Sequence, residues 1–276
     1  MRPIDDENLA QAALLLKKGF AERSHAFWDT SLRQLRIYAE AREAGPIGQL
    51  MMVGDTPAGV ILTIGSRLAD GTRVVNLSSW YVEQKYRWLA PRMLQSVVAD
   101  GAAVYTDLSP SAETIRINEA LGFRAVTGKL AVLFLPCTAL LGGGAGAVVA
   151  LADLPEGALT PDELSMLAEH RALGCLCAAI HAGGRYHPVV FNITRRKGVL
   201  PVAELVYVAR SSLLGEAGAA VARFLLRSGA LFLTFPSERR LPTGIVKKRY
   251  APFQVKGAWD ADRFEQAFSE LAFLRN

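Results

Sequence analysis

The sequence has few cysteines, and nothing in their spacing suggests a disulfide framework. Its 276 residues include three of them: Cys137, Cys175 and Cys177. Such an odd and sparse set argues against a small disulfide-stabilised secreted domain. No secretory signal is visible, because residues 1–7 lead into a helix pattern that carries Lys17 and Lys18. We therefore expect a protein of the reducing cytoplasm.

Charge is absent from residues 130–152, a run long enough on paper to span a bilayer. Pro136 and the glycines at 142–144 and 146 would break a single helix in its middle. The flanking stretches 130–135 and 147–151 each have the length of a strand. We therefore expect two buried strands and no membrane-spanning segment.

Metal-ligand patterns are also scarce. Cys175, Cys177 and His181 could project from one face of a strand, but no fourth ligand is near and the spacing matches no recognised zinc pattern. Buried apolar thiols explain these cysteines better. No metal site is expected.

The composition is that of a folded protein with a modest excess of positive charge. Hydrophobic residues make up 51% and charged residues 21%, which excludes a largely disordered chain. The net charge of +5 favours an anionic partner. Basic clusters at 195–197, 239–240 and 247–249 are most simply solvated loops, although they could line the approach of an acidic substrate. No nucleic-acid-binding motif accompanies them, so nucleic acid is not an expected partner.

Hydrophobic spacing predicts alternating helices and strands in the first half. The predicted elements are a strand at 2–4, helices at 6–19 and 24–39, strands at 49–53, 58–65 and 73–82, a helix at 87–100, a strand at 103–107 and a helix at 111–121. The residues from Gly54 to Pro57 predict a hairpin turn between the second and third strands. Gly122 predicts the end of the last helix.

The pattern returns after a glycine-rich joint near residue 141. Tyr81-Val82 has a counterpart in Tyr207-Val208, and each pair is followed by an apolar helix and an apolar strand. The runs 175–182 and 186–194 form the counterpart of the first hairpin. We interpret this as an internal duplication with two domains, 1–141 and 142–276.

Two motifs in the first half carry a family resemblance. Residues 79–94 run from a strand end, Trp80-Tyr81-Val82, into a helix near Arg87, and Leu121-Gly122-Phe123 closes a later helix. In this order, and among these predicted elements, they resemble the GNAT superfamily of acyl-CoA-dependent N-acetyltransferases. The resemblance implies the α/β (α+β) fold class, with two tandem GNAT-like domains. Each would be a mixed, mostly antiparallel sheet flanked by helices.

The run from Arg87 to Arg92 stands where this family has its pyrophosphate loop. A helix N-terminus there would offer free N–H groups and a positive dipole end to the phosphates of coenzyme A. The resemblance thus implies acetyl-CoA, or another acyl-CoA, as co-substrate. The cofactor-binding residues it implies are Val82, Arg87, Trp88, Leu89, Ala90 and Arg92. Ala90 replaces the family's first glycine, Pro91 brings no N–H, and Arg92 replaces a small residue but adds a charge that can contact phosphate.

The catalytic groups of the family are only partly matched. A tyrosine four residues before Gly122 often protonates the leaving thiolate in the family, and Asn118 stands at that position. An amide donates a hydrogen bond but delivers no proton. Residues 74–81 hold no carboxylate that would serve as base. Our catalytic candidates are therefore Asn118, as a residue lining the site, and Tyr81, as an alternative acid.

The resemblance places the thioester against the end of the strand at 73–82. Strict alternation along this strand would put Leu77, Ser79 and Tyr81 on one face, and Ser78 and Trp80 on the other. A backbone N–H near Tyr81 or Val82 would then polarise the acyl carbonyl.

The second half lacks the loop signature. Residues 209–218 stand in the corresponding place, and Glu216 would face phosphates with the wrong charge. We expect domain 1–141 to bind acyl-CoA and domain 142–276, a degenerate copy, to shape the acceptor site.

The function implied is acyl transfer, with acetyl as the first choice, from coenzyme A to an amine or hydroxyl of a small-molecule or peptide acceptor. Asn118 and the missing carboxylate leave open a catalytically inactive acyl-CoA-binding sensor or scaffold. A basic interaction protein that no longer binds coenzyme A is a third possibility.

Overall fold

The computed structural model describes residues 1–68, 70–196, 198–237, 243–260 and 264–274. The basic residues at 197 and 239–240 lie outside these ranges. The chain forms two compact units. Unit 1 comprises Met1–Val126, Ala251–Trp259 and Phe268–Leu274, and unit 2 comprises Thr127–Tyr250 and Asp260–Ala267. Each unit is thus assembled from separate stretches, unlike the contiguous ranges 1–141 and 142–276 expected from the sequence.

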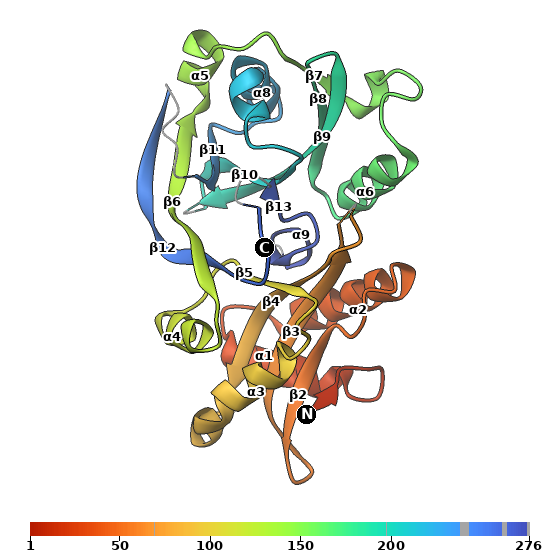
Figure 1. The fold of residues 1–276 in the computed structure, drawn as a ribbon, viewed down its shortest axis with the longest axis vertical. Helices are drawn as coiled ribbons and strands as arrows, with labels where there is room; N and C mark the ends of the chain where they lie inside the picture. The colour runs from red at the N-terminus through yellow and green to blue at the C-terminus, as the bar shows by residue number, and fades with distance from the viewer. Residues whose placement is uncertain (69, 197, 238–242, 261–263, 275–276) are drawn as a thin grey trace. The chain divides into compact units, whose positions relative to one another are not determined.

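Unit 1 contains the predicted order of elements as far as α4 (Figure 1). Its elements are β1 (Arg2–Pro3), α1 (Leu9–Gly19), α2 (His25–Ala41), β2 (Gly48–Val53), β3 (Thr56–Arg67), β4 (Arg73–Val82), the 3-10 helix η1 (Gln84–Leu89), α3 (Ala90–Val97), β5 (Val104–Asp107), α4 (Ala112–Ala120), the second part of β12 (Gly244–Lys256) and α9 (Glu270–Phe273). Local signals set several boundaries. The hydroxyl of Ser24 caps α2 by accepting from the N–H of Phe27, and that of Ser111 caps α4 by accepting from the N–H of Thr114.

The strands of unit 1 lie in the order β1-β2-β3-β4-β5-β12. Neighbours run antiparallel except β4 and β5, which pair in parallel between Val74–Leu77 and Val104–Asp107. The strand β4 continues to Val82, so its last residues extend beyond the end of β5. This parallel pair, at the point where β5 stops, positions the site described below.

Alternating residues of the parallel strands point to opposite faces of the sheet and pack into two different apolar clusters of unit 1. Val75 and Leu77 pack with Met93 of α3, whereas Val74 packs with Phe253 and Val255. The second cluster therefore depends on residues that follow the main segment of unit 2, Thr127–Tyr250, in the sequence.

Unit 2 repeats the same kind of architecture (Figure 1). The strand β6 (Arg124–Phe134) begins in unit 1 and ends here. The other elements are α5 (Leu135–Leu141), β7 (Ala147–Ala150), the 3-10 helix η2 (Leu151–Asp153), α6 (Pro161–Ala172), β8 (Leu176–Ala182), β9 (Arg185–Arg196), β10 (Leu200–Val208), α7 (Leu213–Glu216), α8 (Gly218–Arg227), β11 (Phe232–Pro236), the first part of β12 and β13 (Phe264–Glu265).

The strands of unit 2 lie in the order β7-β8-β9-β10-β11-β6, and β13 pairs with β10. The pair β10 and β11 is parallel, as β4 and β5 are in unit 1, and the other pairs are antiparallel. The fold class is therefore the predicted one: mixed, mostly antiparallel sheets flanked by helices.

The uncharged run 130–152 differs from the expected pair of buried strands. A helix, α5, separates the strands, because Pro136 lies in its first turn, where a missing N–H breaks no intrahelical bond. The strand β7 is only partly buried, since it is the edge of the sheet and pairs with β8 alone. Among the described residues, no helix combines the length and the apolar character needed to cross a bilayer.

Candidate active site

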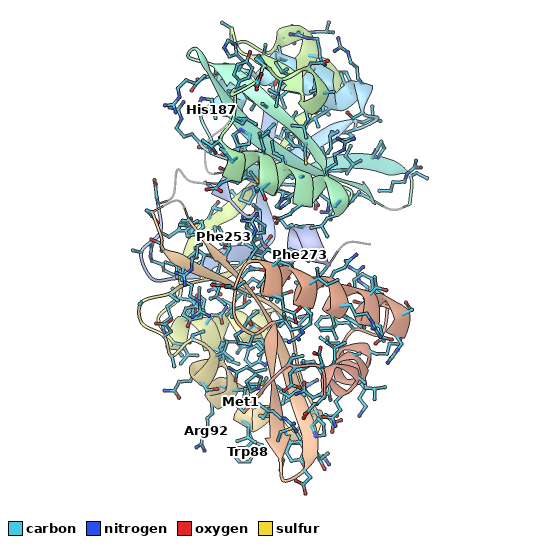
Figure 2. The ribbon with its side chains drawn as sticks, turned by 90° about the vertical axis from the view of Figure 1, so that its right-hand side faces the viewer. Met1, Trp88, Arg92, His187, Phe253 and Phe273 are labelled. Atoms are coloured by element: carbon cyan, nitrogen blue, oxygen red, sulfur yellow. The ribbon has the colours of Figure 1, made fainter. Side chains whose placement is uncertain are left out.

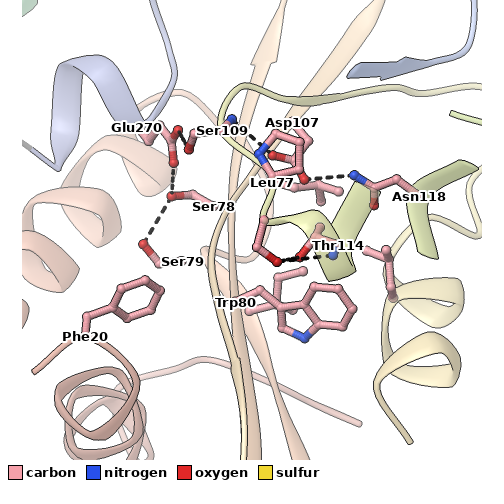
Figure 3. Close-up of a pocket in the computed structure, with 14 residues that line it drawn as sticks. Phe20, Leu77, Ser78, Ser79, Trp80, Asp107, Ser109, Thr114, Asn118 and Glu270 are labelled. Atoms are coloured by element: carbon pink, nitrogen blue, oxygen red, sulfur yellow. Dashed lines mark hydrogen bonds between the residues drawn. The ribbon is translucent and has the colours of Figure 1, made fainter. Parts of the chain in front are cut away.

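Unit 1 contains a pocket of about 200 Å³ where β4 runs past the end of β5 (Figure 3). Its walls come from the end of β4, the end of β5 and the loop that follows it, and α4, together with Phe20 after α1, Ile61 of β3, Leu94 of α3 and Glu270 of α9. The polar side chains that line it are Ser78, Ser79, Asp107, Ser109, Ser111, Thr114, Asn118 and Glu270. Within the described part of the chain, no lysine, arginine or histidine lines this pocket.

A β-bulge in β4 shapes the wall. Ser78 pairs with Leu62 and Tyr81 pairs with Val60, so two residues of β4 lie opposite one residue of β3. Ser79 has a φ of 45°, in the left-handed region that residues other than glycine rarely adopt. As a result Ser78, Ser79 and Trp80 all line the pocket. The strict alternation expected for this strand is therefore wrong.

Asp107 ends β5 and is 8% exposed. Its Oδ1 accepts a hydrogen bond from the backbone N–H of Ser109 at 3.3 Å, and its Oδ2 accepts one from Nδ2 of Asn118 at 2.9 Å. Burial raises the pKa of Asp107 to about 7. The hydrogen bond from Asn118 acts in the opposite direction, and the negative charge of Glu270 raises the pKa further. This carboxyl group is thus present in both protonation states near neutral pH.

Asn118 is completely buried on α4. Its Nδ2 donates to Asp107 and also to Oε1 of Gln254 at 2.9 Å. Its Oδ1 has no hydrogen-bond partner among the described residues, although the residue lines the pocket. Asn118 was predicted to line the site, and it lines this pocket; its contact with Asp107 was not part of that prediction.

Glu270 connects the two strands at the pocket (Figure 3). Its carboxylate accepts a hydrogen bond from the hydroxyl of Ser78 on β4 at 2.8 Å and from the hydroxyl of Ser109 after β5 at 2.6 Å. Its backbone N–H donates to Oδ1 of Asn76 at 3.0 Å. These contacts hold α9 against the ends of both strands.

Sequence reasoning missed both carboxylates of this pocket. The family resemblance places a base on β4, within residues 74–81, and neither carboxylate belongs to that stretch. Asp107 carried a weak signal: it ends an apolar strand and is followed by Ser109, Pro110 and Ser111. Glu270 carried none, since it lies 192 residues after Ser78.

The predicted pyrophosphate loop has a helical conformation. Residues Gln84–Leu89 form η1, which leads directly into α3. The N–H of Tyr86 donates to the carbonyl of Glu83, and the N–H of Ala90 donates to that of Arg87. The N–H groups that precede these bonds belong to Gln84 and Lys85. The first N–H groups of this helical stretch therefore belong to residues that precede Arg87.

The six predicted cofactor-binding residues are spread over this helical stretch. Arg87, Trp88 and Arg92 are exposed, Leu89 is half-buried, and Val82 and Ala90 are buried. Trp88 is 75% exposed, and Figure 2 shows Trp88 and Arg92 pointing outward. None of the six lines the pocket. The structure thus groups three of them on an exposed surface of η1 and α3.

Tyr81 lies next to the end of α1. A Cβ atom on Gly19 would come within 2.5 Å of Cγ of Tyr81, so the ring occupies the space that a side chain at position 19 would need. Tyr81 is half-buried and is not among the residues that line the pocket. Its side chain therefore packs against α1, and its role as an alternative acid stays a prediction.

In unit 2, the turn that stands in the place of the pyrophosphate loop is packed against the glycine-rich joint. Residues 209–218 contain α7, with Leu213 and Leu214 buried. The carbonyl of Glu216 accepts a hydrogen bond from the N–H of Gly146 at 2.9 Å. Gly144, with a φ of 105°, lies so close that a Cβ atom there would be 2.1 Å from this carbonyl. The glycine-rich joint thus fits closely against this turn.

The residues that the structure describes contain no cluster of histidine, cysteine and carboxylate side chains suited to a metal ion. Cys175 is buried and Cys177 is half-buried.

Solved structures resemble this chain over nearly its whole length. A GCN5-related N-acetyltransferase from Anabaena variabilis matches 92% of the chain and 71% of its own, with a TM-score of 0.54 and 12% identity. A putative acetyltransferase from Pyrococcus horikoshii matches 96% of the chain and 91% of its own, with a TM-score of 0.55 and 9% identity. The chain has the GNAT fold.

A third GNAT structure, from Kribbella flavida, matches 92% of the chain and 70% of its own, with a TM-score of 0.53 and 13% identity. No protein-family model matches the sequence, and no curated protein matches it. At these identities the likeness establishes the GNAT fold, and the chemistry has to be argued from the residues of the pocket.

Proposed function

We propose that the protein transfers an acyl group, acetyl in the first instance, from coenzyme A to an amine or hydroxyl acceptor. The observation that carries this proposal is the pocket at the parallel pair β4 and β5, where a bulged strand, an ionisable carboxyl group and several hydroxyl groups come together. Binding pockets with a few convergent polar groups and a perturbed pKa are typical of active sites.

In this proposal the end of β4 provides the hydrogen-bond donor that polarises the acyl carbonyl. Beyond Leu77, β4 has no parallel pairing with β5, so backbone groups on that side are available to a ligand. A backbone N–H near Tyr81 or Val82 would polarise the acyl carbonyl, as the GNAT resemblance implies.

Coenzyme A would approach over η1 and the start of α3. The N–H groups of Gln84 and Lys85 are at a helix start, and Arg87 and Arg92 present exposed positive charge nearby in the sequence. In this arrangement the arginines take the place of the family's glycines in holding the phosphates. No metal is required by these residues.

The acceptor is expected to be a small molecule or a peptide with an amine or hydroxyl group. The second unit would help to shape its binding site and would not itself bind coenzyme A. A cytoplasmic location, which rests on the sparse cysteines, remains part of this proposal.

A second candidate is an inactive protein that binds acyl-CoA as a sensor or scaffold. The buried amide of Asn118 favours it, because the position that carries the acid in many GNAT enzymes cannot release a proton here. Binding without turnover is the behaviour that this candidate requires.

Two measurements separate the candidates. The protein is incubated with acetyl-CoA and a panel of amines and alcohols, and thiol release is followed against a reaction without protein. Calorimetry with coenzyme A measures binding in parallel. Acceptor-dependent thiol release supports acyl transfer, whereas binding without release supports the sensor. Absence of both would overturn both.

A further inference from the structure

Transfer of an acyl group from a thioester to an amine moves one proton from nitrogen to sulfur. Asn118 cannot carry that proton. Among the described residues that line the pocket, the carboxyl groups are those of Asp107 and Glu270. One of these groups must act if the protein itself carries the proton.

Asp107 is the better placed of the two. Its Oδ2 is one hydrogen bond, 2.9 Å, from Nδ2 of Asn118, the residue at the family's acid position. Both oxygens of Glu270 accept hydrogen bonds from serine hydroxyls, at 2.8 and 2.6 Å, which fixes that group between the strands. Asp107 therefore lies where the chemistry of the fold is expected, and Glu270 supports the wall beside it.

We propose that Asp107 is the acid–base residue of this site, an inference that rests on the proposed acyl transfer. Its carboxylate accepts the proton of the attacking amine as the N–C bond forms. The C–S bond then breaks, and the carboxylic acid returns the proton to the departing sulfur. An amine and a thioester thus give an amide and a thiol, and Asp107 ends as the carboxylate with which it began.

The surroundings of Asp107 suit both directions of this transfer. Burial gives it a pKa of about 7, close to the value at which a group both accepts and releases a proton near neutral pH. Glu270 is the charged group that acts on it, from the C-terminal segment. The neutral amide of Asn118 donates a hydrogen bond to it, and the loop contributes the N–H of Ser109.

Asn118 acts in this scheme as a positioning residue. Both hydrogens of its Nδ2 are engaged, one by Asp107 and one by Gln254. Its Oδ1 is buried and has no hydrogen-bond partner among the described residues.

The test uses the full-length protein and the variants Asp107→Asn and Glu119→Gln. Glu119 is the exposed neighbour of Asn118 on α4, so its replacement removes the same charge without touching the pocket. We expect Asp107→Asn to lower kcat about 100-fold or more, with unchanged affinity for coenzyme A by calorimetry. The control should keep its activity.

The pH dependence distinguishes acid–base catalysis from a structural role. The carboxyl carbon of Asp107, followed by NMR without substrate, should titrate near the inflection of the pH–rate profile. Glu270→Gln removes a charge that raises the Asp107 pKa, so both midpoints should move together to lower pH. This variant also provides the test if Asp107→Asn fails to fold.

The outcomes are separable from those of the proposed function. An active wild type whose Asp107→Asn variant keeps kcat within about threefold would overturn the role of Asp107 and leave acyl transfer intact. So would a pH–rate inflection that does not follow the NMR titration in Glu270→Gln. A wild type that binds coenzyme A but releases no thiol with any acceptor overturns acyl transfer, and this inference with it.

Discussion

Asn118 donates a hydrogen bond from Nδ2 to Oδ2 of Asp107 over 2.9 Å. The second hydrogen of the same amide goes to Gln254, which lies directly opposite Asp107 in the pairing of β5 and β12. One buried amide on α4 thus joins the end of β5 to a strand that comes from the far end of the chain. The polar contact is internal to unit 1, and its loss should be measurable.

Replacing Asn118 by leucine should lower the free energy of unfolding by about 2–3 kcal/mol. The volume is similar, but Oδ2 of Asp107 and Oε1 of Gln254 lose their common donor while they remain buried. Urea unfolding measures the change. Glu119→Leu, on the exposed side of the same helix, is the control and should change stability by about 0.5 kcal/mol or less. Equal stability of the two variants would show that the hydrogen bonds of Asn118 with Asp107 and Gln254 do not stabilise the fold.

The stability of the wild type should depend on pH through Asp107. Its folded pKa, about 7, is raised above the ordinary value of 3.8, so the folded state holds the proton more tightly than the unfolded state. The stabilisation is fully present below about pH 4 and is lost as the pH rises through 7. Asp107→Asn should therefore gain stability over the wild type between pH 4 and pH 8, by a few kcal/mol at most. Stability curves that stay parallel over this range would show that the pKa is not raised.

The elements of unit 1 were predictable, whereas the contents of its pocket were not. Apolar periodicity and local signals such as Gly54 and Gly122 set helices and strands within a few residues of their observed bounds. The meeting of Ser78 with Glu270 depends on a pairing between distant parts of the chain, which periodicity does not encode. The conformations of single residues were also missed. Pro136 lies in the first turn of a helix, where it was expected to break one. Ser79 has a positive φ at the bulge, where a glycine in the sequence would have indicated one.

The backbone conformation of Ser79 predicts that glycine is more stabilising than alanine at this position of the strand. Glycine normally weakens a strand relative to alanine by about 0.5–1 kcal/mol. At a φ of 45° the order should reverse, because glycine adopts this region without steric cost. We expect Ser79→Gly to unfold at a higher urea concentration than Ser79→Ala, corresponding to about 1 kcal/mol. Both variants lack the hydroxyl, so the comparison isolates the backbone. A more stable alanine variant would mean that the bulge is absent in solution.

The exposed arginines of η1 and α3 should matter for coenzyme A. Arg87→Glu and Arg92→Glu each place a negative charge where the phosphates are proposed to bind, and each should weaken the affinity about tenfold by calorimetry. Arg33→Glu, an exposed arginine on α2, has the same charge change and serves as the control. The loss should shrink at high salt, since the contacts are exposed. Unchanged affinity in both variants would remove the phosphate site from this surface.

Because unit 1 includes two stretches from the C-terminal part of the chain, a fragment of residues 1–141 should be unable to form it. It holds every predicted cofactor residue, yet it lacks Ala251–Trp259 and Phe268–Leu274, which belong to unit 1. Phe253 and Val255 are buried in the apolar cluster with Val74, and each contributes about 1.5–3 kcal/mol through burial. Since whole domains are stable by only about 5–15 kcal/mol, the fragment should be poorly soluble or unfolded.

The same reasoning predicts how the fragment would be rescued. Without the missing stretches, β5 also becomes an unpaired edge on the side that β12 covers, and exposed edges of this kind promote aggregation. Co-expression with residues 142–276 restores β12 and α9, so it should return a soluble protein in which coenzyme A binds. Gel filtration and calorimetry compare the two preparations. A fragment 1–141 that is soluble, monomeric and binds coenzyme A with the affinity of the whole chain would show that the C-terminal segments are dispensable, and the assembly of unit 1 described above would then be wrong.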